Sequence, residues 1–301
     1  MAEYENLLEI KNLSFSFKTY GGTVKAVRDV SYSLRKGEIL GIVGESGCGK
    51  SVTAQCIMRL NPEPPGFFEG GEILYKGKDV LKMSKAELKQ LRSKEIGFIF
   101  QDPMTSLNPT MRVGKQIEEV FTGHKGVSKA EVHEKALNIM KLVGISDAEK
   151  RFRQYPHELS GGMKQRIMIA MALVSEPSMI ICDEPTTSLD VTIEAQILDL
   201  LLELREKLGT SIIMITHDLG VIAKLCDRVV VMYGGKVMEH GTVDEIFYDT
   251  AHPYTNALMN SIAGLDTNKN TVLKPIPGTP PDLFAPPHGC PFAARCDYAM
   301  K

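Results

Sequence analysis

Residues 39–51 read ILGIVGESGCGKS, and this stretch decides the fold. Its first five residues are apolar and predict a buried strand. The remaining eight fit the phosphate-loop pattern G-x-x-x-x-G-K-[ST], in which glycines let backbone N–H groups and a helix N-terminus face phosphates. We expect Lys50 to reach the β- and γ-phosphates and Ser51 to ligate Mg²⁺. The predicted nucleotide-binding residues here are Gly44, Glu45, Ser46, Gly47, Cys48, Gly49, Lys50, Ser51 and Val52.

Further apolar runs alternate with helical patterns as far as Tyr233, which predicts an α/β fold with a largely parallel sheet. Besides Ile39–Val43, the expected strands are Ile96–Phe100, Met179–Cys182, Ile212–Ile215 and Val229–Tyr233. Residues 102–160 have a helical pattern instead, with a capping box at Ser128 and Glu131 and a stop at Gly144. This stretch predicts a helical subdomain inserted between two strands. A second long helix is expected over residues 191–208.

The strand predicted at residues 179–182 ends in two acids. Asp183 is expected to hold Mg²⁺, directly or through water. Glu184 follows on the other side of the strand end, where it could polarise an attacking water. Two acids at the end of a strand are, by themselves, more often simply exposed to solvent. Because this chain also has a phosphate loop, the catalytic interpretation is favoured.

Residues 159–166 read LSGGMKQR and begin a helix that runs to about Ser175. Ser160 is a suitable N-cap, and the simplest interpretation is that it does only this. Gly161 and Gly162 also expose backbone donors, which makes a second anion site at a helix N-terminus. One chain thus has two candidate sites for a γ-phosphate.

With these motifs the chain resembles ATP-binding cassette (ABC) proteins. The resemblance implies a P-loop, RecA-like ATPase with an antiparallel N-terminal part. In this family, residues 159–166 correspond to the signature motif. The resemblance implies that the signature motif of one subunit closes on ATP held by another, so that catalysis needs a second ABC ATPase subunit, identical or not. Further family elements occur in order along the chain: Gln101 after a strand, the SLD run at residues 188–190, and His217 after another strand.

The resemblance gives these residues roles. It assigns Gln101 to Mg²⁺, the attacking water and coupling, His217 to the γ-phosphate, and Asp190 to the D-loop. Together with Glu184 and Lys50, Gln101 and His217 form the expected catalytic set. Tyr20 is the candidate for stacking on adenine, with Phe17 as the alternative.

The strings QDPMTSLNP at residues 101–109 and HPY at 252–254, with the proline-rich tail, look like oligopeptide and dipeptide importers. In that family two ATPase subunits lie beneath two membrane permease subunits, and an external solute-binding protein delivers the peptide. The resemblance therefore implies a peripheral protein on the cytoplasmic face of the membrane, whose helical insert meets the permeases. The solute itself stays open, and importers of nickel chelates or other small solutes remain alternatives. So does a soluble, non-transport ABC ATPase, although the chain has one cassette and no long heptad run.

Composition shifts after Gly241, and we expect an ATP-binding domain over residues 1–245 and a C-terminal extension over 246–301. Seven prolines between Pro275 and Pro291 exclude regular helix there. Cys290 and Cys296 have the spacing C-x₅-C, too loose to name a metal. The resembling family carries four cysteines in this tail, which can hold a four-iron four-sulfur cluster, so the sequence is expected to stop inside that motif. Two free thiols, or zinc, are the alternatives.

The bulk properties of the 301 residues agree with this interpretation. The content is 43% hydrophobic and 24% charged, as in globular chains. The net charge is −2, so the chain lacks the excess of positive charge that is typical of nucleic-acid-binding proteins. No apolar run approaches the length of a membrane span, and no signal peptide opens the chain, so we expect no bilayer crossing and no disulfides. The chain fits a GTPase or small-molecule kinase less well. Such a function would leave residues 159–166 unexplained, and the chain has no Asn-Lys-x-Asp string with which to recognise guanine.

Overall fold

The computed structural model describes residues 5–102, 106–121, 127–186, 190–261 and 276–300. The chain divides into two compact units, of which unit 1 comprises residues 1–82 and 216–301 and unit 2 comprises residues 83–215. Several residues named above lie outside the described ranges, namely Pro103, Met104, Thr105, Ser188, Leu189 and Pro275.

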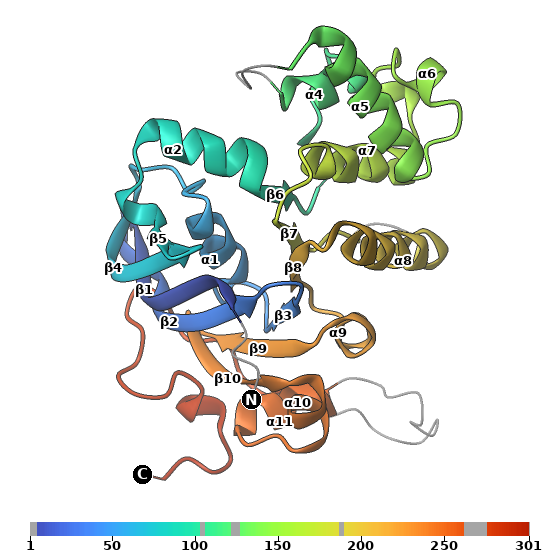
Figure 1. The fold of residues 1–301 in the computed structure, drawn as a ribbon. Helices are drawn as coiled ribbons and strands as arrows, with labels where there is room; N and C mark the ends of the chain where they lie inside the picture. The colour runs from blue at the N-terminus through green and yellow to red at the C-terminus, as the bar shows by residue number, and fades with distance from the viewer. Residues whose placement is uncertain (1–4, 103–105, 122–126, 187–189, 262–275, 301) are drawn as a thin grey trace. The chain divides into compact units, whose positions relative to one another are not determined.

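Unit 1 contains two sheets, shown in Figure 1. The first has the strand order β2-β1-β4-β5, and all its neighbouring pairs are antiparallel. In the second, β3 pairs parallel with β9, and β9 pairs antiparallel with β10. The strands are β1 (Asn6–Thr19), β2 (Gly22–Arg35), β3 (Ile39–Val43), β4 (Gly66–Tyr75), β5 (Lys78–Asp79), β9 (Arg228–Tyr233) and β10 (Lys236–Thr242). The helices are α1 (Lys50–Ile57), α9 (Leu219–Leu225), α10 (Val243–Tyr248), α11 (Pro253–Asn260) and the 3₁₀ turns η1 (Val80–Lys82) and η4 (Ala293–Arg295).

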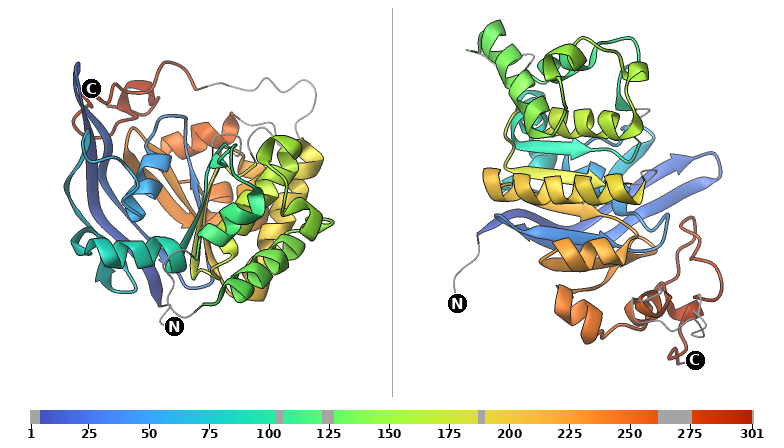
Figure 2. Two further views of the ribbon diagram at one scale, coloured as in Figure 1. Left: turned by 90° about the horizontal axis from the view of Figure 1, so that it is seen from above. Right: turned by 90° about the vertical axis from the view of Figure 1, so that its right-hand side faces the viewer.

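The long antiparallel pair β1 and β2 is curved, as both views of Figure 2 show. Leu8 and Ile10 face the core, after which the register shifts and Leu13 and Phe15 continue the buried row. Every residue of β3 is buried, as expected for a strand covered on both faces. At Gly41 a Cβ atom would lie 2.7 Å from Ile222 Cδ1, so glycine is what allows α9 to approach this strand closely.

Unit 2 contains the three parallel strands β6, β7 and β8, with β7 in the middle. They comprise β6 (Ile96–Ile99), β7 (Met179–Asp183) and β8 (Ser211–Ile215). The helices are α2 (Lys85–Gln90), the π-helical turn η2 (Leu91–Glu95), α4 (Val113–Glu119), α5 (Lys129–Leu142), α6 (Ala148–Arg151), the 3₁₀ turn η3 (Pro156–Glu158), α7 (Gly161–Leu173) and α8 (Val191–Leu208). Helices α4, α5, α6 and α7 form one cluster (Figure 1).

All five predicted strands are confirmed, although β6 ends one residue earlier than expected, at Ile99. The helix signals are confirmed as well. Ser128 and Glu131 form the capping box of α5, and α8 ends at Gly209, whose φ is 65°. The signature helix α7 ends at Leu173, two residues before the predicted stop. Among the described residues, no helix is both long and apolar enough to span a bilayer.

Candidate functional site

The phosphate loop joins the buried strand β3 to α1 within unit 1. Gly44, Gly47 and Gly49 all have positive φ, which side-chain-bearing residues rarely adopt. A Cβ atom at Gly44 would also overlap the carbonyl oxygen of Met232. The loop's path therefore depends on glycine both for its dihedral angles and for its packing. Its crest, at Ser46 and Gly47, is exposed.

Lys50 is the first residue of α1 and is only 6% exposed. Its Nζ atom donates to the carbonyl oxygens of Gly44 at 2.7 Å and Glu45 at 3.1 Å. The ammonium group is thus held inside the loop by backbone acceptors. A bound phosphate could replace these acceptors, because a lysine ammonium group is a strong phosphate ligand.

His217 follows β8 in the chain but belongs to unit 1. Its neighbour Thr216 donates its backbone N–H to Ile42 O at 3.4 Å, and Ile42 lies on the strand that leads into the phosphate loop. Asp218 caps α9 by accepting the backbone N–H of Gly220 at 2.7 Å. This local framework holds His217, which is exposed, near the end of β3.

Tyr20 lies in the turn between β1 and β2. It is fully exposed, so its ring is accessible to a ligand. The alternative, Phe17, is half-buried and packs edge-on against Phe15, with ring centroids 5.1 Å apart. Tyr20 is therefore the better candidate for stacking on a planar base.

In unit 2 the acidic pair lies at the carboxyl end of β7. Asp183 is the last residue of the strand and is 4% exposed, whereas Glu184 begins the turn with φ 47°. The Glu184 N–H donates to Ile215 O at 2.9 Å, which fixes this turn against β8. Gln101 Nε2 donates to Glu184 Oε2 at 2.8 Å. Two of the predicted catalytic side chains are therefore in direct contact.

The signature helix α7 begins at Gly161, and Ser160 caps it by accepting the Met163 N–H at 3.4 Å. Ser160 and Gly161 are exposed, so the predicted anion site faces solvent. At the start of α8, Asp190 is exposed and holds the N-cap position without a side-chain cap bond.

One buried contact in unit 2 has no counterpart among the predictions. Gln165, 1% exposed, donates its amide Nε2 to the carbonyl oxygen of Pro185, the residue that follows the acidic pair. It therefore joins the signature helix to the end of β7. The only sequence signal for it was its place inside the LSGGMKQR string.

The C-terminal cysteines lie in unit 1. Cys290 is exposed, Cys296 is half-buried, and Cys290 Sγ lies 3.9 Å from His252 Nε2. Within the described ranges, no three His, Cys, Asp or Glu side chains are grouped so that they could hold a metal ion. A four-iron four-sulfur cluster takes four thiolates, of which Cys290 and Cys296 would supply two, so the cluster expected for a longer chain stays a prediction.

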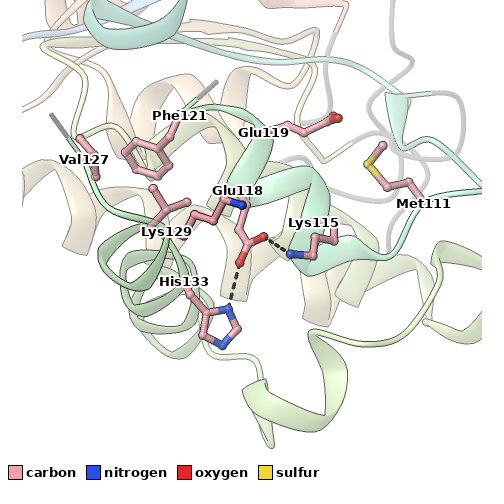
Figure 3. A pocket seen from close by; sticks show the side chains of 9 residues that line it. Met111, Lys115, Glu118, Glu119, Phe121, Val127, Lys129 and His133 are labelled. Carbon is pink, nitrogen blue, oxygen red and sulfur yellow. Dashed lines mark hydrogen bonds and ion pairs between the residues drawn. The ribbon is translucent and has the colours of Figure 1, made fainter. Parts of the chain in front are cut away.

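The helical cluster of unit 2 contains a pocket of about 810 Å³ between α4 and α5 (Figure 3). Inside it Glu118 accepts hydrogen bonds from Lys115 Nζ at 2.6 Å and His133 Nδ1 at 2.9 Å. Partial burial raises the pKa of Glu118, but the hydrogen bonds and the electrostatic attraction of Lys115 and His133 together outweigh it and hold the pKa below its ordinary value. Phe121 and Val132 supply apolar wall.

Comparison with known proteins agrees with this geometry. A family model for ABC transporters matches residues 27–187, and one for the C-terminal region of oligopeptide/dipeptide transporters matches residues 238–301. The oligopeptide transport ATP-binding protein OppD of Bacillus subtilis is 58% identical over all of this chain and 84% of its own length. The dipeptide transport ATP-binding protein DppD of the same organism is 55% identical over 98% of this chain and 88% of its own.

Among solved structures, the dimeric, post-hydrolysis state of the ATP-binding cassette MJ0796 with ADP and Pi matches with a TM-score of 0.70. The two sequences are 28% identical, and the match covers 78% of this chain and 98% of the MJ0796 chain. The ABC transporter component cbiO1 of Clostridium perfringens matches with a TM-score of 0.68 at 31% identity, over 81% of this chain and 91% of its own. A family match that spans more than half of the residues, with relatives this similar over the full length, shows that the chain belongs to the ABC transporter family, as an ATP-binding and ATP-hydrolysing cassette.

Proposed function

We propose that this chain is the ATPase subunit of a peptide importer. The ATPase part is supported by the phosphate loop with Lys50 drawn into it, and this observation carries the proposal. The peptide part is supported by the oligopeptide and dipeptide transport relatives and by the match of residues 238–301.

In the proposed reaction, Lys50 and the loop's backbone N–H groups bind the phosphates, and Tyr20 stacks on adenine. Glu184 polarises the attacking water, and Gln101 orients that carboxylate through its 2.8 Å hydrogen bond. His217 contacts the γ-phosphate. The proposed Mg²⁺ ligands are Ser51, Gln101 and Asp183, whose hydroxyl, amide and carboxylate oxygens are the hard donors that this ion prefers. Bound Mg²⁺ supplies charge neutralisation for the phosphates.

We further propose that two cassettes act together, the exposed signature of one meeting ATP on the other. The dimeric structure of MJ0796 supports this arrangement. Ser160, Gly161 and Gly162 would be the in-trans contacts, with Asp190 at the same interface. The remaining partners are two membrane permeases, bound through the helical insert, and an external solute-binding protein. The chain itself then lies on the cytoplasmic face of the membrane.

Substitution of Glu184 tests the catalytic part. Glu184→Gln removes the base but keeps the side chain's shape, so ATP binding should stay within about twofold while turnover falls at least about a hundredfold. Glu203→Gln, exposed on α8, is the matched control and should leave both unchanged. Turnover of Glu184→Gln equal to that of the control would remove Glu184 from its role.

Reconstitution tests the transport part. The chain is purified with the permeases and binding protein that accompany it and placed in vesicles. Peptide presented with the binding protein should stimulate ATP hydrolysis and accumulate inside the vesicles. Stimulation by a nickel chelate and not by peptides would contradict the proposed substrate class while leaving the ATPase assignment intact.

A further inference from the structure

Residues of the C-terminal region, which comprises residues 246–301, contact Glu45, the second residue of the phosphate loop. Arg295 Nη1 lies 2.8 Å from Glu45 Oε2, and the two residues are 250 positions apart in the chain. The Arg295 side chain is 7% exposed and that of Glu45 is 23% exposed. The ion pair is therefore mostly shielded from solvent, where charge-assisted hydrogen bonds are stronger than on the open surface.

Arg295 has little freedom to move. Its Nε and Nη2 atoms donate to the carbonyl oxygens of Pro277 at 2.7 Å and Ile276 at 3.1 Å. Nη1 also donates to the Tyr233 hydroxyl at 2.9 Å, and the guanidinium group lies over the Tyr233 ring, 5.6 Å from its centroid. The positive charge is thus fixed in place before any ligand arrives.

A second contact holds the backbone of the same loop residue. The Glu45 N–H donates to the Tyr254 hydroxyl at 3.0 Å. Tyr254 has no exposed surface, and its ring packs against Tyr233 and Phe292, with centroids 4.6 and 5.2 Å away. Because the Glu45 carbonyl in turn accepts Lys50 Nζ, these contacts run from the C-terminal region to the proposed phosphate-binding lysine.

The same C-terminal region also meets the turn that carries Tyr20. Leu283 O accepts the Lys25 N–H at 2.9 Å. A Cβ atom at Gly21 or Gly22 would lie 3.6 Å from the Phe284 ring, which places that ring directly against the turn. The C-terminal region thus contacts two of the segments in unit 1 to which nucleotide contacts are assigned, the phosphate loop and the turn of Tyr20.

A carboxylate in a loop that receives a triphosphate poses an electrostatic problem. Glu45 is negative and so is the ligand, and like charges at close range weaken binding. A fixed positive partner neutralises the carboxylate and also reduces the conformational entropy that a glycine-rich loop loses on binding.

We propose that Arg295 is a positioning residue for ATP binding. Arg295 neutralises Glu45 and holds the phosphate loop in the conformation that binds phosphate. This proposal rests on the proposed nucleotide-binding role of the loop. It assigns to the C-terminal region a part in nucleotide affinity that is separate from any contact with membrane partners.

The test is a double-mutant cycle with the non-hydrolysed analogue Mg-AMP-PNP as the probe and calorimetric titration of the full chain as the assay. Arg295→Met leaves a bare carboxylate in the loop and should raise the Kd about five- to tenfold. Adding Glu45→Gln removes that carboxylate, so the double variant should bind more tightly than Arg295→Met alone. Glu45→Gln alone completes the cycle. A recovery in the double variant that exceeds any gain in Glu45→Gln alone distinguishes a charge-positioning role from simple loss of packing.

Arg28→Met is the matched control, because Arg28 Nη2 donates to Pro287 O at 3.0 Å, in the same C-terminal region, without contacting Glu45. Its Kd should stay within about twofold of the parent protein. Equal Kd shifts for the two arginine variants, or a double variant that binds no better than Arg295→Met, would overturn the proposal. Should Arg295→Met not fold, Arg295→Gln keeps hydrogen-bond donors without the charge and replaces it in the same cycle. A parent protein that binds no analogue at all would instead refute the nucleotide-binding role of the loop.

Discussion

The buried hydrogen bond between Gln165 and Pro185 allows a sharp prediction, that Gln165→Met lowers both stability and turnover. The two side chains are similar in volume, so the change creates no large cavity. It leaves the carbonyl oxygen of the buried Pro185 without the Gln165 amide. Loss of such a partner costs about 1–3 kcal/mol, so we expect the free energy of unfolding to fall by about 2 kcal/mol.

At roughly 2–4 °C per kcal/mol, this corresponds to a Tm about 4–8 °C lower in a thermal scan of the ATP-free protein. Turnover should fall at least about fivefold, because the end of β7 loses its tie to the signature helix, while nucleotide affinity stays within about twofold. Gln90→Met, an exposed change on α2, should stay within about 0.5 kcal/mol of the parent protein. A Tm for Gln165→Met within about 1 °C of this control would refute the reasoning.

Two further predictions concern Glu118 and Tyr20. Because the pKa of Glu118 is held below its ordinary value of 4.5, its carboxylate stabilises the folded state above that pH, and the contribution is lost as pH falls through the lowered value. In urea titrations, Glu118→Gln should therefore be less stable than the parent protein at pH 7, and the difference should shrink progressively below pH 4.5; a difference that is constant with pH would contradict this. Tyr20→Ala should weaken ATP binding about tenfold in fluorescence titrations whereas Tyr20→Phe should leave it nearly unchanged, because stacking needs the ring and not the hydroxyl. Equal affinities for the two Tyr20 variants would remove the residue from the base site.

The sequence was most informative where the signal was local. A strand of five apolar residues, a glycine-rich loop and a following lysine lie within thirteen positions, so residues 39–51 could be interpreted without knowledge of the rest. The capping box of α5 and the glycine that ends α8 are equally local, and both were confirmed. The order of the weaker motifs then supplied Gln101, Glu184 and His217 as candidates, whose catalytic roles stay predictions.

The sequence was least informative for the N-terminal sheet and for long-range contacts. Register shifts in β1 and positive φ values at Asn12 and Asp29 interrupt the alternation by which a half-buried strand is recognised. Consequently an antiparallel part could be expected by resemblance but its strands could not be delimited. The contact of Arg295 with Glu45 has no local pattern at all, since its geometry exists only once the two ends of unit 1 have met.

Unit 1 is built from two separate parts of the sequence, and this affects how the chain folds during its synthesis. Residues 83–215 of unit 2 are contiguous, whereas unit 1 combines residues 1–82 with residues 216–301. During synthesis unit 2 can complete its contacts while unit 1 still lacks β9, which lies beside β3, and Arg295, which holds Glu45. Folding from the ribosome would therefore leave the phosphate loop incomplete after unit 2 has formed, since contacts across such separations form slowly. A newly made chain would reach its full affinity for nucleotide only after β9 and Arg295 have left the ribosome and made these contacts.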